Sequence, residues 1–178
     1  MKLLVKELVV SVVLLMRNLL ALDQSSRTCG FAVFSDGDLL TYGHFYLKSD
    51  NHGKRLVQLR EEIAKLIKDY MIDSVVFEDI QLQSNVPNNV ATYKILAEVY
   101  GVVEEYVSEI NLDNHSVLPV VWKSGLKIKG ARRAEQKKNA QKYVLETYGI
   151  TATEDEADAI CIGAHTVKTK ISNEFDWS

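Results

Sequence analysis

Two short apolar runs, each ending in an acidic residue, constrain the fold of this chain more than any other feature. Residues 19–22 are followed by Asp23, and residues 74–77 are followed by Glu78. A short, continuous apolar run is typical of a central strand that is covered on both faces, because neither face needs polar side chains. The two runs therefore predict a sheet with helices packed on both sides.

The remaining pattern fills in an α/β fold. Residues 31–34 and 39–45 are predicted strands, and the Asp-Gly pair between them is a strong hairpin signal. Apolar residues recur at helical spacing over 53–70, and further helices are expected from the polar loop after Glu78 to about 110, over 132–148 and from near Thr153. A fifth strand is predicted over 116–121. This order predicts a mixed five-stranded sheet flanked by helices, with three antiparallel strands first.

The predicted helix near 88–110 has an unusually wide apolar surface. At 100° per residue its apolar side chains cover an arc of roughly 200°, whereas one sheet contact requires about 100°. Such a helix packs on two partners, and a second subunit is one candidate.

The chain is expected to form a single domain over residues 16–172, with residues 1–15 as an N-terminal appendage. Its apolar run at 8–16 is far shorter than the ~20 residues that span a bilayer, so no membrane helix is expected there. The two cysteines, Cys29 and Cys161, cannot build a disulfide framework, which favours a reducing, cytoplasmic compartment. The four histidines lack the spacing of zinc ligands.

Charge is distributed unevenly along the chain, although the net charge is only −3. Between Trp122 and Lys142 there are eight Lys or Arg residues against one acid, and the rest of the chain is strongly acidic. A basic segment on an acidic body suits a polyanion that is bound at one place. A solvated, lysine-rich helix face is the alternative on charge alone.

Asp23 and Glu78 come directly after the two buried strands. An ionised side chain there is costly unless it is paired or binds a metal, and no basic residue is adjacent in sequence. Taken singly, each is better explained as a strand-end acid that reaches water.

The last predicted helix contributes further acids. Thr153 and Glu156 fit a capping box, which accounts for Glu156 structurally. Asp158 lies beyond the first turn and shares a face with Asp155, and this face continues through Cys161. Two acids in line with an apolar stripe are predicted to point toward the sheet.

Three elements thus deliver carboxylates that are expected to meet at one place. Such a group repels phosphate unless divalent cations reverse the charge, and Mg²⁺ prefers oxygen ligands of this kind. Two ions about 4 Å apart stabilise the attacking and leaving oxygens of phosphodiester hydrolysis. The sequence therefore predicts a magnesium-dependent phosphodiester hydrolase.

Three segments together resemble the RuvC family of Holliday junction resolvases, which has the RNase H-like fold. They are Leu-Ala-Leu-Asp23-Gln-Ser-Ser, Val-Val-Phe-Glu78-Asp and Asp155-Glu-Ala-Asp158-Ala-Ile, and the resemblance covers about residues 17–170. It implies a dimeric, Mg²⁺-dependent endonuclease that cuts two strands of a four-way DNA junction in recombination, repair or DNA packaging. Asp23, Glu78, Asp155 and Asp158 are then the catalytic metal ligands for two ions, with Mn²⁺ able to substitute. The helix near 88–110 falls where the family forms its dimer interface.

The basic segment resembles the family's DNA-contacting stretch. The candidate DNA-binding residues are Lys123, Lys127, Lys129, Arg132, Arg133, Lys137 and Lys138. Because the spacing differs by a few residues, either Lys137 or Lys138 is the main contact. The chain also lacks the aromatic residue that the family commonly has shortly after the strand-end Glu, since Ile80-Gln-Leu-Gln83 stands there. We therefore expect recognition of branch geometry and phosphate rather than of base sequence.

Two alternatives remain open at this stage. A related RNase H-like nuclease that trims ribosomal RNA precursors would use the same acids on a linear RNA. A non-catalytic module that binds branched DNA would have lost the use of the acids, all of which are present here.

Overall fold

The computed structural model describes residues 17–81 and 89–174, and these contain a five-stranded mixed sheet in the order β3-β2-β1-β4-β5. β2 is antiparallel to both β1 and β3, whereas β4 is parallel to β1 and β5 is parallel to β4. The elements are β1 (Asn18–Asp23), β2 (Thr28–Ser35), β3 (Asp38–Tyr46), α2 (His52–Asp69), β4 (Ser74–Glu78), α3 (Asn89–Glu109), β5 (Asp113–Val117), α4 (Pro119–Gly125), α5 (Arg133–Tyr148) and α6 (Glu154–Glu174). This is the RNase H-like α/β arrangement that the sequence predicts, with three antiparallel strands first.

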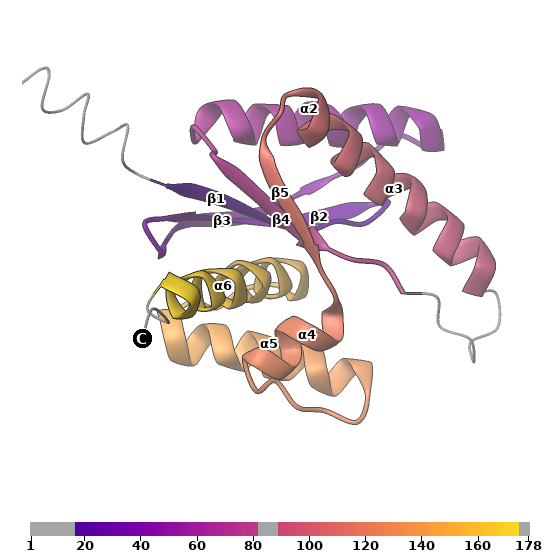
Figure 1. Ribbon diagram of the computed structural model, residues 1–178. Coiled ribbons are helices and arrows are strands. Elements are labelled where there is room, and N and C mark those ends of the chain that lie inside the picture. Colours follow the sequence, from indigo (N-terminus) through magenta and orange to yellow (C-terminus); the bar gives the residue numbers. More distant parts are fainter. Residues whose placement is uncertain (1–16, 82–88, 175–178) are drawn as a thin grey trace, which may run out of the picture.

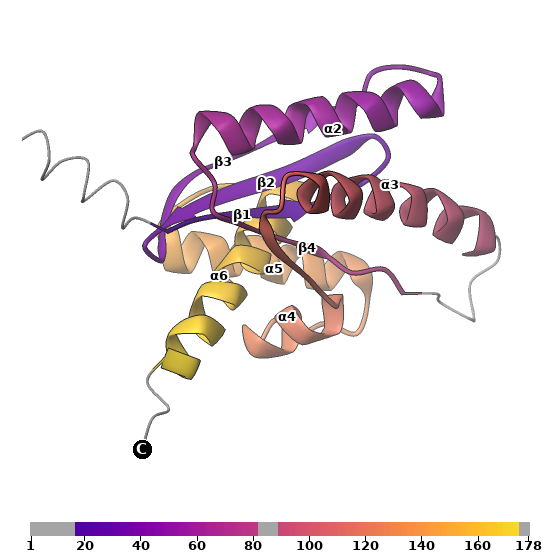
Figure 2. The ribbon, with the colours of Figure 1, turned by 45° about the horizontal axis from the view of Figure 1, so that its top comes forward.

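The sheet lies between two layers of helices. α2 and α3 cover one face, and α4, α5 and α6 cover the other (Figure 1; Figure 2). Successive residues of β1 belong to different cores: Ala21 packs in the core on the α6 side, whereas Leu20 and Leu22 pack in the core under α2 and α3. Both faces of β1 are therefore buried, which is why its sequence is continuously apolar.

The hairpin between β2 and β3 forms at the predicted Asp-Gly pair. Asp36 and Gly37 both have positive φ, at 51° and 93°. Two consecutive positive φ angles match the twist of antiparallel strands, and Asp followed by Gly adopts them at low cost. The Asp-Gly pair therefore correctly predicts the turn that joins β2 to β3.

The predicted strand over 116–121 is wrong in its position. β5 ends at Val117, and Pro119 begins the short helix α4 after an extended Leu118. Proline is favoured in a first helical turn because its φ is preset and no N–H is needed there. The polar Asp113–Val117 segment forms an edge strand, so its hydropathy gave little signal. Trp122, directly after the predicted strand, is buried on α4.

α3 is only partly covered by the other described residues. Val99, Val103 and Val107 are fully buried, whereas Val90 is 75% and Ile95 38% exposed. The N-terminal half of the helix extends past the edge of the sheet (Figure 1). The wide apolar arc is therefore real, and one part of it has no cover among the described residues.

Two other expectations concern the chain ends and the compartment. The proposed appendage at residues 1–15 lies outside the described residues. Among the residues that are described, no helix has the length and apolar character needed to cross a membrane. Cys29 and Cys161 are both buried and free.

Candidate active site

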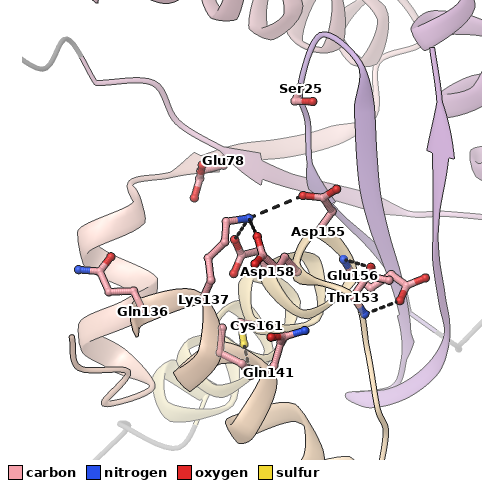
Figure 3. A network of polar contacts seen from close by, with 12 residues as sticks. Ser25, Glu78, Gln136, Lys137, Gln141, Thr153, Asp155, Glu156, Asp158 and Cys161 are labelled. Carbon is pink, nitrogen blue, oxygen red and sulfur yellow. Dashed lines mark hydrogen bonds and ion pairs between the residues drawn. The ribbon is translucent and has the colours of Figure 1, made fainter. Parts of the chain in front are cut away.

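The topology brings the acids of β1 and β4 to one end of the sheet. These strands are parallel neighbours, paired as far as Leu22 with Phe77, so Asp23 and Glu78 follow at the same end. α6 packs against β1 and β2 and begins near this end, and it contributes Asp155 and Asp158. Figure 3 shows Glu78, Asp155 and Asp158 arranged around Lys137.

Gly30 allows the start of α6 to approach the sheet. It pairs with Asp23 across β1 and β2. A Cβ atom at this position would overlap the backbone carbonyl group of Asp155. Only glycine leaves room for that contact, so Gly30 sets how close Asp155 comes to Asp23.

We expect Gly30→Ala to push the first turn of α6 away from the sheet. Overpacking of this kind typically costs about 1–3 kcal/mol of unfolding free energy, which urea titration will measure. DNA cleavage should fall at the same time. Gly101→Ala is the control, because its Cβ would meet nothing within 4 Å and alanine favours the α3 helix. If Gly30→Ala keeps wild-type stability and cleavage, this close approach is unimportant.

The capping box at the start of α6 is confirmed. The backbone N–H of Thr153 donates to Glu156 Oε2 at 2.8 Å, and the N–H of Glu156 donates to Thr153 Oγ1 at 3.4 Å. Glu156 Oε1 also lies 2.8 Å from His44 Nδ1 on β3. Burial acts to raise the pKa of Glu156, but its bonds to Thr153 and His44 prevail and lower it. Glu156 therefore fixes the helix to β3 rather than joining the other acids.

Lys137 places a positive charge among the carboxylates. Its Nζ lies 3.4 Å from Glu154 Oε2, 3.7 Å from Asp155 Oδ1 and 3.4 Å from Asp158 Oδ2. Burial disfavours its charged form, but Asp158, Asp23 and Asp155 outweigh burial and raise the pKa of Lys137. The basic segment thus reaches the acids directly at this residue.

Three of the four acids are electrostatically strained. Burial, followed by the charges of Glu78 and Asp158, raises the pKa of Asp23 well above its ordinary value. Burial also raises the pKa of Glu78, against the lowering effect of a hydrogen bond from Trp122. Burial raises the pKa of Asp158 despite the nearby Lys137. Buried acids whose pKa values are raised together at one place, despite a neighbouring lysine, are characteristic of functional sites.

The donor set fits a hard divalent cation. Carboxylate oxygens are the ligands that Mg²⁺ prefers, and a cation would relieve the repulsion that raises these pKa values. Within residues 17–81 and 89–174, no three His, Cys, Asp or Glu side chains are gathered around one point as metal ligands. Lys137 is the cation that Asp155 and Asp158 contact in this structure.

The predicted DNA-binding residues divide into three groups. Lys123 and Lys137 lie beside the acids: the Lys123 ammonium is 3.3 Å from Gln136 Oε1, and its charge acts on both Glu78 and Asp158. Lys127 and Lys129 instead line a separate cleft of about 270 Å³. The exposed residues Arg132, Arg133 and Lys138 complete the set, and of these Arg133 also acts on the charge of Glu78.

Sequence reasoning missed two residues that hold Glu78. Gln24 Oε1 accepts from the Glu78 N–H at 3.1 Å, and Gln24 Nε2 donates to the Glu78 carbonyl at 2.5 Å. Trp122 Nε1 donates to Glu78 Oε1 at 3.0 Å. The position of Gln24, directly after Asp23, was an available signal. No local pattern marked Trp122, because it lies 44 positions from Glu78 in the sequence.

The sheet order, together with acids at the ends of β1 and β4 and at the start of α6, defines an RNase H-like protein of the nuclease type. The fold is similar to that of RuvC from Thermus thermophilus in complex with a Holliday junction substrate, with a TM-score of 0.66, 14% identity and coverage of 86% of this chain and 96% of that one. It is also similar to the yeast mitochondrial Holliday junction resolvase Ydc2, with a TM-score of 0.55, 13% identity and coverage of 87% and 80%.

The sequence profile of the family described as crossover junction endodeoxyribonuclease RuvC matches residues 19–165. The chain therefore belongs to the RuvC family, and its function is that of a Holliday junction resolvase. Nucleases of this family are metal-dependent. Among curated proteins no sequence matches this chain.

Proposed function

We propose that this resolvase hydrolyses DNA strands at the carboxylate end of the sheet, with Asp23, Glu78, Asp155 and Asp158 as its catalytic metal ligands. One observation carries the proposal: β1, β4 and α6 bring acids with raised pKa values to one place beside Lys137. A buried cluster of this kind is costly for the fold and is retained at sites that bind cations.

Two Mg²⁺ ions are proposed to bind these acids, with Mn²⁺ as a substitute. When bound, they activate the attacking water and stabilise the leaving oxygen of the cleaved strand. The protein groups hold and orient: Asp23 and Glu78 are anchored on strands, and Asp155 and Asp158 on the first two turns of α6. Lys123 and Lys137 lie where they can position the phosphate that is cut, since both act on the same acids.

The exposed basic residues are proposed to bind the phosphates of the DNA arms. Phosphate contacts supply affinity and set orientation without reading sequence. Lys138 is exposed, whereas Lys137 is half-buried against the acids. This difference supports separate roles for two lysines that the sequence left as equal candidates.

We expect Lys138→Glu to weaken junction binding and to lower the slope of log affinity against log salt, because a phosphate contact is lost. Lys137→Gln should also reduce cleavage of DNA that is already bound, because it removes the cation beside Asp158. Binding at several salt concentrations and single-turnover cleavage will separate the two effects. Equal losses of binding and equal cleavage of bound DNA in both variants would contradict this assignment.

A homodimer through α3 is proposed to make the two cuts that resolution requires. The exposed Val90 and Ile95 lie on the half of α3 that extends past the sheet. An apolar surface of this kind favours association with a second copy. A dimer places two sites against one four-way junction.

Branch geometry, rather than base sequence, is proposed to select the substrate. Ile80 and Gln81 follow the strand-end acids without an aromatic side chain that could stack on a base, and Leu82 and Gln83 lie outside the described residues. Cleavage positions mapped on junctions of shuffled sequence will test this. A strict short consensus at every cut would overturn it.

The decisive experiment compares a labelled four-way junction, a linear duplex and an RNA, each with Mg²⁺ and with a chelator. We expect cleavage of the junction that requires Mg²⁺. Preferential cutting of the RNA would favour a role in RNA processing. Tight junction binding without cleavage in Mg²⁺ would favour a non-catalytic DNA-binding module.

A further inference from the structure

The Gln24 side chain holds the backbone of Glu78 with two hydrogen bonds, as the backbone of a paired strand would. Both polar atoms of the Gln24 amide bond to the peptide groups of this one residue, at 3.1 Å to its N–H and 2.5 Å to its carbonyl. The β1–β4 pairing ends one position earlier, at Leu22 and Phe77. Gln24 is 7% exposed, so water does not compete freely for these bonds. Its amide therefore continues the ladder just beyond the last paired residues.

The carboxylate of Glu78 is held from another element. The indole N–H of Trp122 donates to Oε1 at 3.0 Å, and Trp122 is fully buried in the core under α6. An indole packed on all sides cannot follow a moving carboxylate, so it fixes the direction of the Glu78 side chain. The second oxygen of Glu78, Oε2, makes no hydrogen bond within the described residues. Because the Trp122 bond fixes Oε1, it also fixes the direction in which Oε2 points.

We propose that Gln24 and Trp122 are positioning residues that set Glu78 for binding a divalent cation. The inference rests on the proposed function, in which Glu78 is a metal ligand. Side chains that orient a ligand commonly contribute a factor of about 10–100 to metal affinity or activity. Gln24 aligns the backbone of Glu78 with the end of β1, and Trp122 aligns its carboxylate, so the distance between Asp23 and Glu78 depends on both.

The test measures Mn²⁺ binding to metal-free protein without DNA, by electron paramagnetic resonance. We expect Gln24→Met, which keeps the length and loses both bonds, to weaken Mn²⁺ binding about 10–100-fold. Trp122→Phe should act in the same direction because it removes only the N–H donor and part of the ring. Cleavage should then need more Mg²⁺, whereas junction binding in the presence of a chelator should remain at the wild-type value.

Gln58 provides a matched control. Its amide makes the same pair of bonds to backbone groups, donating to the Tyr46 carbonyl at 3.2 Å and accepting from the Lys48 N–H at 3.1 Å. Gln58→Met should leave Mn²⁺ binding unchanged because this pair lies beyond β3 rather than beside Glu78. A loss of the same size in Gln58→Met would mean that the effect is general destabilisation, and the inference would be overturned.

Glu78→Gln separates failure of the inference from failure of the proposed site. If Glu78→Gln binds Mn²⁺ as the wild type does, Glu78 is not a ligand and the proposed site is wrong. If Glu78→Gln weakens binding but Gln24→Met and Trp122→Phe do not, the site stands and the inference falls. Thermal melting checks that each variant is folded, and if Gln24→Met is unfolded the result with Trp122→Phe decides.

Discussion

Asp23→Asn is expected to abolish junction cleavage while leaving junction binding almost intact. After burial, the charges of Glu78, Asp158 and Asp155 all raise the pKa of Asp23, so Asp23 lies among the other acids. Loss of an outer partner of a metal ligand already costs about 10–100-fold, so loss of a ligand itself should exceed 100-fold. Affinity, in contrast, comes mainly from Lys and Arg contacts to phosphate, which this substitution does not touch.

Single-turnover cleavage with saturating enzyme measures the first effect, and a gel-shift titration in chelator measures the second. Asp113→Asn is a suitable control because Asp113 begins β5 at the opposite end of the sheet and is exposed. It should cleave at the wild-type rate. Near-normal cutting by Asp23→Asn would remove Asp23 from the catalytic site.

The buried strands, the hairpin and the helix cap could be predicted because each depends on a local sequence pattern. Continuous apolar runs mark strands buried on both faces, and the Asp36-Gly37 pair marks a hairpin. The capping box of Thr153 and Glu156 likewise depends on residues three apart. In each case the signal and the structure lie within a few residues of one another.

What could not be predicted depends on distant residues. Gln24 and Glu78 are 54 positions apart, and their contact requires the register of β1 against β4. Gly30 matters only because α6 crosses β2 at that point. The fifth strand was misplaced because an edge strand is held by backbone pairing more than by burial, so Asp113–Val117 carries little apolar signal. These contacts depend on the order and pairing of the strands and on the packing of α6, which cannot be read from local sequence patterns.

The buried acids should make the metal-free protein less stable as the pH rises above their unfolded pKa values. Burial and mutual repulsion raise the pKa values of Asp23, Glu78 and Asp158 above their unfolded values of 3.8, 4.5 and 3.8. In the window above those values the folded state holds more protons than the unfolded state, so the free energy of unfolding falls with rising pH until the folded-state pKa values are passed. Lys137, whose pKa is raised above 10.5, loses its own contribution only at higher pH.

Mg²⁺ should restore this stability, and more so at pH 8 than at pH 5, because cations and protons compete for the same oxygens. A Mg²⁺ concentration of about 100 times Kd adds about 2.7 kcal/mol to the free energy of unfolding.

Asp23→Asn should be more stable than the wild type without metal, on the order of 1 kcal/mol, because it relieves a strained site. It should also gain little from Mg²⁺. Urea titrations of both proteins at pH 5 and pH 8, with Mg²⁺ and with chelator, will measure these differences. If the metal-free wild type and Asp23→Asn change in stability by the same amount between pH 5 and pH 8, Asp23 is not strained, and the electrostatic reason for a cation site would be lost.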